Sequence, residues 1–529
     1  MQANNKVNLI LKISIFFILL LGFYNALMLG ASWDEPFHHI LGIERLAYLL
    51  SFGNLKNYSF GVSQYYPGFY DTFAASIYFF IEKINFNFAV NYLVQIKHVV
   101  NFIFSTMSIV GLYKVLKLYS KNELFSLLAC VLTLLTPSFF GHLSINPKDI
   151  VIFFSLIWFI YFFSIYILYK KNLKYLILFS VFLGFGCGTR LSFAILPLPI
   201  ILFGIVYNFR KFDLTFINFI KNNFSHIVIS LMIICFFSFI TWPHLHSLDF
   251  DIIKTTVLRS INWTAGPKLG LINGFFYETS DTPKTYFLSF VFYKMPIYQS
   301  IIFLCSIFIV IFKKNFFCKN INNFLIIRNF CLLFISYIIL IVLCLNVKIY
   351  DGIRLFLFLI PFFCTICGFF LLYLFAEFKN NLNKFITAVI VVFFLSFLLR
   401  FISLNPYQYI YLNSNPIIDK NGFENDYWNV SFKELIEKIP AEIEGKNVGD
   451  YNFFICGGDY KVARYYLVKK FKKKINITNF QKADLSIMTN RASFNVKDKR
   501  TCFQKYLGDE LLSINRSNVK LSKLIKISK

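Results

Sequence analysis

The sequence predicts an all-α polytopic membrane protein of about eleven transmembrane helices, with a small C-terminal α/β domain outside the membrane. Of the 529 residues, 57% are hydrophobic and only 15% are charged, whereas soluble domains carry about 25% charged residues. Apolar runs long enough to cross a bilayer recur over the first 403 residues. From Gly445 onward the pattern changes to short strand-like and helix-like runs.

The candidate spans follow one another through short connections. The first span has Lys12 near its start and no acidic residue, and the fifth and sixth are divided only by the GCGTR stretch. The candidate spans are Leu9–Met28, Val94–Tyr113, Leu124–Phe140, Ile150–Tyr169, Tyr175–Cys187, Leu191–Tyr207, Ile227–Trp242, Ile297–Phe312, Phe324–Leu345, Leu355–Phe375 and Phe385–Ile402.

The apolar segment Tyr66–Ile84 decides the expected topology. If it lies along the membrane surface, every basic connection falls on the same side as Lys6 and Lys12; if it spans, those connections move to the opposite side. The positive-inside rule favours the first arrangement, with the amino terminus in the cytoplasm and the carboxyl terminus outside. The basic connections are Lys114–Lys121, Lys170–Lys174, Arg210–Lys221, Lys313–Arg328 and Lys379–Lys384.

The net charge of +26 would suggest a nucleic-acid partner in a soluble protein. Here the basic residues lie in loops between apolar spans, so we expect the lipid bilayer and no nucleic acid as a partner. Cys456 and Cys502 lie in the polar tail and would be able to pair if that tail is extracytoplasmic.

Three parts of the chain are expected. Residues 1–403 form the transmembrane domain, with 31–93 as its first outer loop, and residues 404–444 connect it to a domain over 445–529. In that last part NVGDYNFFICG predicts a strand, DYKVARYYLVKK a helix, and INITNF and ADLSIMT two further strands. The DYW stretch of the connecting segment is expected to dock this domain onto the membrane body.

Two adjacent acids follow the first span directly. In the stretch WDEP (33–36), Pro36 suits the first turn of a helix, and Asp34 or Glu35 would suit its cap and dipole. From Phe37 to Leu50 the apolar side chains share one face, which predicts an amphipathic helix in the membrane interface. Capping explains one acid but does not require two acids beside two histidines. All the unusual polar stretches, including NPKD, TRL, WPH and YDGIR, fall on the outer side in this topology, which is typical of a membrane enzyme.

The DE pair after the first span, followed by a juxtamembrane helix, resembles the C-type (GT-C) glycosyltransferases. Within them it is most similar to the protein O-mannosyltransferase-like group and its bacterial relatives. Five later stretches resemble that group in order and spacing: TPSFFGHLSINPKD (136–149), LGFGCGTRLS (183–192), YDGIRLFLFLIP (350–361), NPYQYIYLN (405–413) and ENDYWNVSFKEL (424–435).

This resemblance implies a GT-C-like fold and transfer of a sugar from a polyprenyl-phosphate donor to a glycan, lipid or protein acceptor, with inversion at the anomeric carbon. It implies a bacterial plasma membrane, with the active site and the C-terminal domain on the periplasmic side. It implies no particular cofactor and leaves a divalent metal ion open. It does not identify the sugar or the acceptor.

Transfer of this kind needs a base near the acceptor hydroxyl. Asp34 is the candidate general base, and Glu35 and Asp149 are the other candidate catalytic acids. Asp149 would orient the acceptor or bind a metal, unless it only caps the helix that begins before Ile150.

The leaving phosphate needs cations, and arginine binds its oxygens through two parallel hydrogen bonds. Arg190 and Arg354 lie at outward ends of spans and are the candidate phosphate ligands, with Lys148 assisting; the alternative is that these side chains reach the lipid headgroups or solvent. The candidates for substrate or metal contacts are His38, His39, His142 and His244, although interfacial histidines are more often hydrogen-bonded scaffold.

Two other classes of function remain. A transporter or flippase for a lipid-linked or small-molecule substrate would be expected to show internal repeats and polar groups within its spans, and we see no internal repeat. A noncatalytic protein with the same fold would have no reason to keep the DE pair, which is present here.

Overall fold

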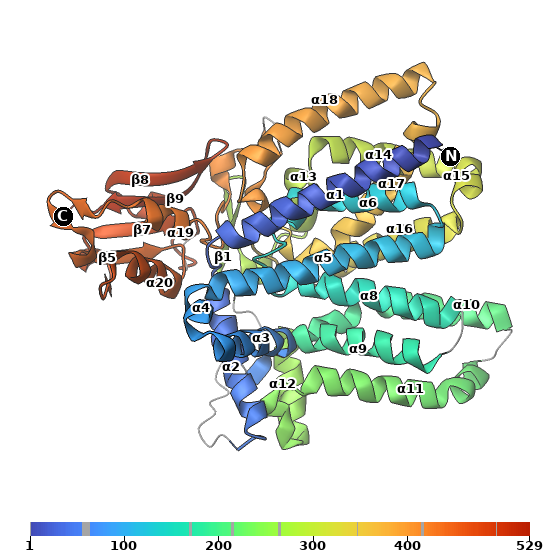
Figure 1. The fold of residues 1–529 in the computed structure, drawn as a ribbon, viewed down its shortest axis with the longest axis horizontal. Coiled ribbons are helices and arrows are strands. Elements are labelled where there is room, and N and C mark those ends of the chain that lie inside the picture. The colour runs from blue at the N-terminus through green and yellow to red at the C-terminus, as the bar shows by residue number, and fades with distance from the viewer. Residues whose placement is uncertain are drawn as a thin grey trace.

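A computed structural model describes residues 2–54, 64–168, 172–212, 216–262, 266–345, 347–413, 417–492 and 495–528. Long helices run in nearly the same direction through a bundle, and a smaller domain with a β-sheet lies at one end of it (Figure 1). The N-terminus lies at the other end (Figure 1). The expected connections Lys170–Lys174 and Arg210–Lys221 fall partly outside the described residues.

The helices of the bundle come from the whole length of the transmembrane part. They are α1 (Gln2–Met28), α5 (Leu93–Ser120), α6 (Glu123–Leu134), α8 (Asp149–Leu168), α9 (Leu173–Thr189), α10 (Leu198–Phe212), α11 (Phe216–Phe239), α14 (Ile297–Phe312), α16 (Phe324–Cys344), α17 (Ile360–Ala376) and α18 (Asn381–Ser403). Shorter elements connect them: α2 (Glu35–Leu50), α3 (Phe69–Ile84), α4 (Phe86–Asn91), α7 (Pro137–Phe140), α12 (Phe250–Asn262), the antiparallel pair β1 (Leu269–Ile272) and β2 (Phe275–Glu278), α13 (Tyr286–Lys294), α15 (Lys314–Asn320) and the 3₁₀ turn η5 (Arg354–Leu359).

The expected multi-pass class is confirmed. Within the described residues, six helices are long and apolar enough to cross a membrane, or seven if α13 and α14, bent by 115° against each other, are one span. Four shorter apolar helices complete the set, and each predicted span falls on one of these helices. The number of crossings stays a prediction.

The segment that decided the expected topology forms α3. This helix is not among those that are apolar enough to span. It packs tightly on α2, since a Cβ atom added to Gly42 would lie 2.3 Å from the carbonyl oxygen of Asp71. This placement agrees with a helix outside the set of spans; which end of the bundle faces the cytoplasm stays a prediction.

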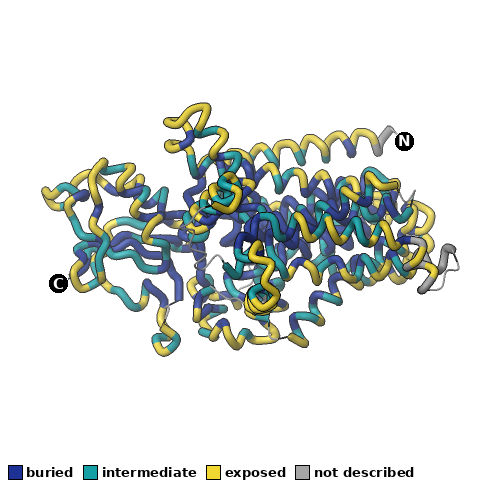
Figure 2. Tube along the Cα trace, turned by 90° about the horizontal axis from the view of Figure 1, so that it is seen from below, coloured by how far each residue is buried: buried dark blue, intermediate teal, exposed yellow. Residues whose placement is uncertain are grey.

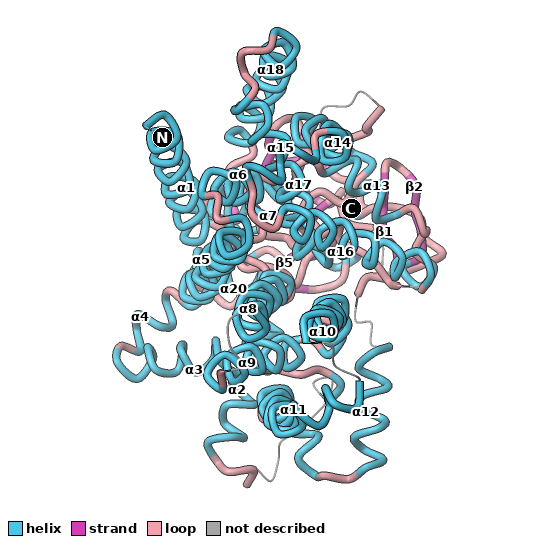
Figure 3. Tube along the Cα trace, turned by 90° about the vertical axis from the view of Figure 1, so that its right-hand side faces the viewer, coloured by secondary structure: helices cyan, strands magenta, loops and turns pink. Residues whose placement is uncertain are grey.

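Helix α17 is the centre of the bundle. Of its apolar window 89% is buried, against 6% for α1. Viewed along the helices, α17 lies among α6, α14 and α16, whereas α1 and α18 lie at the edge (Figure 3). The N-terminal helix is mostly exposed along its length (Figure 2). Apolar surface of this extent indicates contact with lipid.

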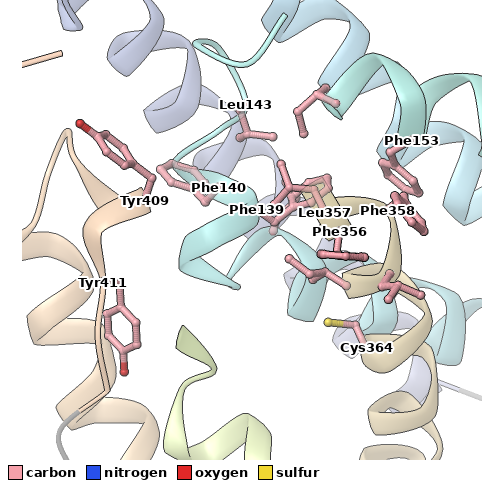
Figure 4. Packing of buried hydrophobic residues seen from close by; sticks show 14 of the residues in the cluster. Phe139, Phe140, Leu143, Phe153, Phe356, Leu357, Phe358, Cys364, Tyr409 and Tyr411 are labelled. Carbon is pink, nitrogen blue, oxygen red and sulfur yellow. The ribbon is translucent and has the colours of Figure 1, made fainter. Parts of the chain in front are cut away.

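A layer of buried aromatic side chains supports the end of the bundle that faces the C-terminal domain. Phe139 packs on Phe153 with 5.6 Å between ring centroids, and Phe140 packs on Phe401 at 5.0 Å. Figure 4 shows Phe139, Phe140 and Phe153 in the same region as Phe356 and Tyr409, which come from η5 and from the segment after α18. Burial of each ring stabilises the fold by about 1.5–3 kcal/mol, so the loops above this layer rest on a rigid base.

The predicted interfacial helix is α2, which begins at Glu35, two residues before its apolar pattern. Pro36 lies in its first turn. Its exposed side chains include Phe37, Ile40 and Ile43, whereas Arg45 is fully buried against the protein. The apolar face therefore points outward, as an interfacial helix requires, and the charged face points into the protein.

The C-terminal region contains a mixed five-stranded sheet of order β6-β5-β7-β9-β8, with parallel pairs among β6, β5 and β7 and antiparallel pairs β7–β9 and β9–β8. This confirms the expected small sheet region; the β8–β9 hairpin adds to the expected strands. The elements are α19 (Phe432–Lys438), β3 (Glu442–Ile443), β4 (Lys446–Asn447), β5 (Asn452–Cys456), α20 (Tyr460–Phe471), β6 (Asn476–Ile477), β7 (Leu485–Thr489), α21 (Cys502–Lys505), β8 (Asp509–Arg516) and β9 (Val519–Lys526).

A disulfide joins Cys456 and Cys502 within this region. Disulfides persist in oxidising compartments and are rare in the cytosol. The DYW stretch lies between the sheet and the bundle, where Asp426 accepts hydrogen bonds from the backbone and hydroxyl of Ser431, and the Ser431 hydroxyl contacts that of Ser522 on β9 at 2.7 Å. The stretch therefore contacts the C-terminal sheet through Ser431.

Candidate active site

A polar cavity lies where the bundle meets the C-terminal region, with an empty volume of about 820 Å³. Its walls come from the loops before α2 and α8, the end of α9, the YDGIR turn, the DYW stretch and the segment after β7. The charged side chains that line it are Asp34, His38, Lys148, Arg190, Asp351, Arg354 and Arg491.

Asp34 precedes α2 and keeps 39% of its side-chain surface accessible. Within the described part of the chain its carboxylate accepts no capping hydrogen bond from α2, so capping does not account for this acid. Its closest ion-pair contact is Arg354 Nη1 at 3.8 Å. Burial alone would raise the pKa of Asp34, but Arg354, His38 and two further cations together lower it. The carboxylate is therefore ionised at neutral pH.

Arg354 lies within 4 Å of three carboxylates around this cavity, including that of Asp34. Its guanidinium lies 3.7 Å from Asp149 and 3.0 Å from Asp351, and it stacks over Trp428 at 4.8 Å. Its buried Nε has no hydrogen-bond partner among the described residues. A buried donor left in this way costs about 1–3 kcal/mol, which a stable protein tolerates most readily at a functional site.

Two further cations line the wall formed by the α8 and α9 ends. Arg190 pairs with Asp149 at 3.2 Å, and Lys148 Nζ lies 3.4 Å from the ring centroid of Tyr66. Burial would raise the pKa of Tyr66, but Lys148 and Arg190 lower it overall. The two cations therefore give this wall of the cavity a positive electrostatic potential. Asn146, and not Asp149, supplies the cap at the start of α8, since its Oδ1 accepts from the backbone N–H of Asp149 at 2.8 Å.

Arg491 reaches the cavity from the C-terminal region and was not foreseen. It pairs with Asp351 at 3.1 Å and stacks over Trp33 at 4.9 Å. The turn that presents Asp351 has left-handed backbone at both Asp351 (φ 57°) and Gly352 (φ 73°), a conformation that glycine adopts freely. The YDGIR stretch pointed to this turn, but no pattern in the sequence around Arg491 does.

Other predicted site residues lie elsewhere. Glu35 turns away from the cavity into a neighbouring one, where it accepts from His98 at 2.9 Å and from the backbone of Ser32. His142 contacts the Tyr427 hydroxyl at 2.9 Å and is buried, as scaffold histidines are. Neither His39 nor His244 lines the cavity that contains Asp34.

The sequence left open whether the site holds a divalent metal ion. Among the residues that the structure describes, no three His, Cys, Asp or Glu side chains form a group that would hold a metal ion. Asp34 and Asp149 are each paired with arginine instead.

Comparison with protein families gives one match. The family model described as dolichyl-phosphate-mannose-protein mannosyltransferase matches residues 76–242. The chain is mannosyltransferase-like over this range. The match confirms the resemblance read from the sequence there, and this mannosyltransferase-like range contains Lys148, Asp149 and Arg190, but not Asp34 or Arg354.

Two solved structures are similar to the chain over nearly its whole length. ArnT from Cupriavidus metallidurans bound to undecaprenyl phosphate has 9% identity and a TM-score of 0.49, covering 97% of each chain. The same protein in the apo state has 10% identity and a TM-score of 0.48, covering 99% of this chain and 98% of the other. The search among curated proteins found no match.

Glu424 gives the C-terminal contact a pH dependence. Burial raises its pKa from 4.5 to about 7, and its carboxyl accepts the backbone N–H of Ala492. Because the folded-state pKa is raised, this group destabilises the fold least below its ordinary pKa of 4.5. Stability is lost as the pH rises from there through 7, by about 3 kcal/mol in all.

We expect Glu424→Gln to abolish this loss, since a glutamine oxygen still accepts from Ala492 and never ionises. Thermal unfolding of the purified protein between pH 5 and pH 8 measures it. Glu442→Gln, at an exposed carboxyl on β3, is the matched control and should keep the wild-type pH dependence. An unchanged dependence in Glu424→Gln would refute the assignment.

Proposed function

We propose that this membrane protein is a glycosyltransferase that transfers a sugar from a polyprenyl-phosphate donor to an acceptor hydroxyl. The observation that carries the proposal is the composition of the cavity. It brings Asp34, whose carboxylate makes no capping hydrogen bond with α2 in the described chain, together with four cations at one end of an apolar bundle. The family that residues 76–242 match is described as dolichyl-phosphate-mannose-protein mannosyltransferase, a description that supports a lipid-phosphate sugar donor and sugar transfer.

The cations fit the chemistry of the leaving group. A donor phosphodiester carries one negative charge, and the departing polyprenyl phosphate carries up to two. Arg354, Arg190, Lys148 and Arg491 would bind the phosphate oxygens and stabilise the added charge, which is larger in the transition state than in the bound donor. No strong acid is needed on the leaving oxygen, because phosphate departs as a stable anion.

Asp34 would hold the acceptor hydroxyl and remove its proton as the oxygen attacks the anomeric carbon. Such a base contributes about 10²–10⁴-fold. We propose attack opposite the phosphate and hence inversion, by analogy with inverting glycosidases, in which base and leaving group lie on opposite faces of the sugar. Asp149, held by Arg190 and Arg354, would orient those two arginines.

The reaction would take place on the outer face of a bacterial plasma membrane. The N-terminus lies at the opposite end of the bundle from the cavity (Figure 1), and the disulfide of the C-terminal region suits an oxidising compartment. The basic connections would then face the cytoplasm.

Mass spectrometry of the lipids that co-purify with the protein tests the donor class. We expect a polyprenyl-phosphate sugar to be enriched on Asp34→Asn, which binds the donor but does not consume it, relative to wild type. The bound lipid would also identify the sugar. Bulk phospholipid alone on both proteins, under an extraction that leaves the donor on a control glycosyltransferase, would contradict the proposal and favour a transporter or a noncatalytic protein.

A further inference from the structure

A buried histidine–aspartate pair lies at the wall of the cavity that contains the candidate base. The Nδ1 atom of His38 lies 3.2 Å from Oδ2 of Asp71 on α3, and both side chains are almost fully buried. His38 lines two cavities, the one that contains Asp34 and a smaller neighbouring one. The function proposed above does not use this pair.

The pair is held in one arrangement. Arg45 is fully buried, lies 3.4 Å from the same oxygen of Asp71 and donates to the backbone carbonyl of Tyr66 at 2.8 Å. A Cβ atom on Gly68 would collide with that guanidinium at 2.1 Å, so the chain leaves room for Arg45 only because residue 68 is glycine. His38 and Arg45 together lower the pKa of Asp71, although burial alone would raise it. Asp71 is therefore a fixed carboxylate that accepts from His38.

The second ring nitrogen of His38, Nε2, is the atom that would accept a proton. With Nδ1–H donating to Asp71, the neutral imidazole has its lone pair on Nε2, and no described residue hydrogen-bonds Nε2. His38 follows Asp34 by four positions at the start of α2, and its backbone N–H donates to the carbonyl of Asp34 at 3.0 Å. Residues four apart share one helix face.

Asp34 needs such a neighbour. The surrounding cations lower its pKa, so it holds a hydroxyl well but retains a proton poorly. A general base is most efficient when its own pKa lies near the operating pH, so a carboxylate of low pKa gains from a second group that takes the proton on.

We propose that His38, oriented by Asp71, is the final proton acceptor of the transfer reaction. The inference rests on the proposed function and names a second proton-handling residue in the same cavity. As the acceptor oxygen bonds to the anomeric carbon, the bond from that carbon to the phosphate oxygen breaks with its electron pair. The hydroxyl proton goes to Asp34 and then to Nε2 of His38, and the imidazolium later releases it to water.

The charges balance in this scheme. The phosphate gains one negative charge on leaving, and the imidazolium beside Asp71 gains one positive charge in the same cavity. The other charged or titratable side chains that line the same two cavities are Asp34, Glu35, His39, Tyr66, Tyr70, Lys97, His98, Lys148, Arg190, Tyr350, Asp351, Arg354 and Arg491.

The test is a pH–rate profile. Because Glu424 also titrates near neutrality, the parent protein is Glu424→Gln. The assay follows release of free polyprenyl phosphate from total polyprenyl-phosphate sugars extracted from the native membrane, with native membranes as the source of acceptor. We expect kcat of the parent to fall on the acid side of the profile, because a protonated imidazole no longer accepts the proton.

Two substitutions remove the basic ring nitrogen of His38 in different ways. His38→Asn keeps a donor where Nδ1–H meets Asp71 and removes the acceptor; His38→Gln removes the contact with Asp71. Both are expected to lower kcat by about 10²-fold, with little change in donor KM, and to abolish the acid limb. His226→Asn, at a histidine that contacts Tyr166 on α8, is the matched control and should keep both kcat and the limb.

The outcomes are decisive in each case. The inference is overturned, and the proposed function is left intact, if kcat of the parent does not fall at acidic pH. The same conclusion follows if both His38 variants keep that fall, or if both keep the kcat of the parent. Absence of any turnover in the parent and in wild type refutes the proposed function and the inference with it. If neither variant folds, ¹⁵N NMR of histidine-labelled wild type decides: an unprotonated Nε2 at pH 8 that gains a proton along the limb supports the inference, and an Nε2–H tautomer at pH 8 overturns it.

Discussion

Replacement of Asp34 by Asn is expected to lower kcat by about 10²–10⁴-fold while leaving folding, membrane insertion and donor binding intact. The amide keeps the size of the carboxylate and still hydrogen-bonds the acceptor, but it does not accept a proton. Because Asp34 makes no capping hydrogen bond within the described chain and keeps 39% of its side-chain surface accessible, its loss removes little that stabilises α2.

Release of polyprenyl phosphate measures this effect, and retention of the donor on the purified variant measures binding. Asp509→Asn, at an exposed carboxylate on β8, is the matched control and should turn over as wild type does. Normal kcat in Asp34→Asn would show that another group removes the proton. Loss of donor binding in the same variant would assign Asp34 to the binding of the donor.

Replacement of Arg354 by Gln is expected to reduce both function and stability. This arginine lies within 4 Å of three carboxylates, Asp34, Asp149 and Asp351. Removing it takes away the ion-pair contact of Asp34 and leaves Asp149 and Asp351 with one arginine each, Arg190 and Arg491. The fold is destabilised by less than a fully unpaired buried charge would cost, which is about 3–5 kcal/mol, and the planar group best suited to the donor phosphate is lost. We expect donor affinity to fall by about 10²-fold or more, since charge-assisted hydrogen bonds contribute about 1.5–3 kcal/mol each.

Arg354→Lys separates the two effects. Lysine keeps the charge but loses the planar fork and the stack over Trp428, so stability should largely recover while donor affinity stays reduced. Thermal unfolding and a binding titration with polyprenyl phosphate measure the two quantities. Arg328→Gln, at the opposite end of the bundle beside Phe324, is the control and should change neither. Wild-type donor affinity in Arg354→Gln would remove Arg354 from the phosphate site.

The membrane class and the positions of the apolar helices followed from the sequence because they depend on local composition. A helix in lipid must form all its backbone hydrogen bonds within itself and present apolar side chains. Each membrane-spanning helix is therefore an apolar run of residues that can be recognised without knowing its neighbours in space. The same holds for α2, whose apolar spacing predicts an interfacial helix and whose exposed residues in the structure match that spacing.

Which of two adjacent acids faces the cavity depends on tertiary packing. Asp34 and Glu35 look equivalent in the sequence, yet only Asp34 lines the cavity, while Glu35 pairs with His98 on α5. The burial of Arg45 on α2 also depends on tertiary packing. Its side chain is buried because it pairs with Asp71 on α3 and donates a hydrogen bond to the backbone carbonyl of Tyr66.

The sequence by itself determined that this is a multi-pass protein, that its unusual polar stretches follow the ends of spans, and that part of it resembles a mannosyltransferase. Only the tertiary structure decided which of those stretches meet. Arg354 and Asp34 are separated by more than three hundred residues, and Arg491 comes from a different part of the chain altogether. Ion pairs and cavities depend on distances of a few ångströms between side chains, and local sequence patterns carry no information about such distances.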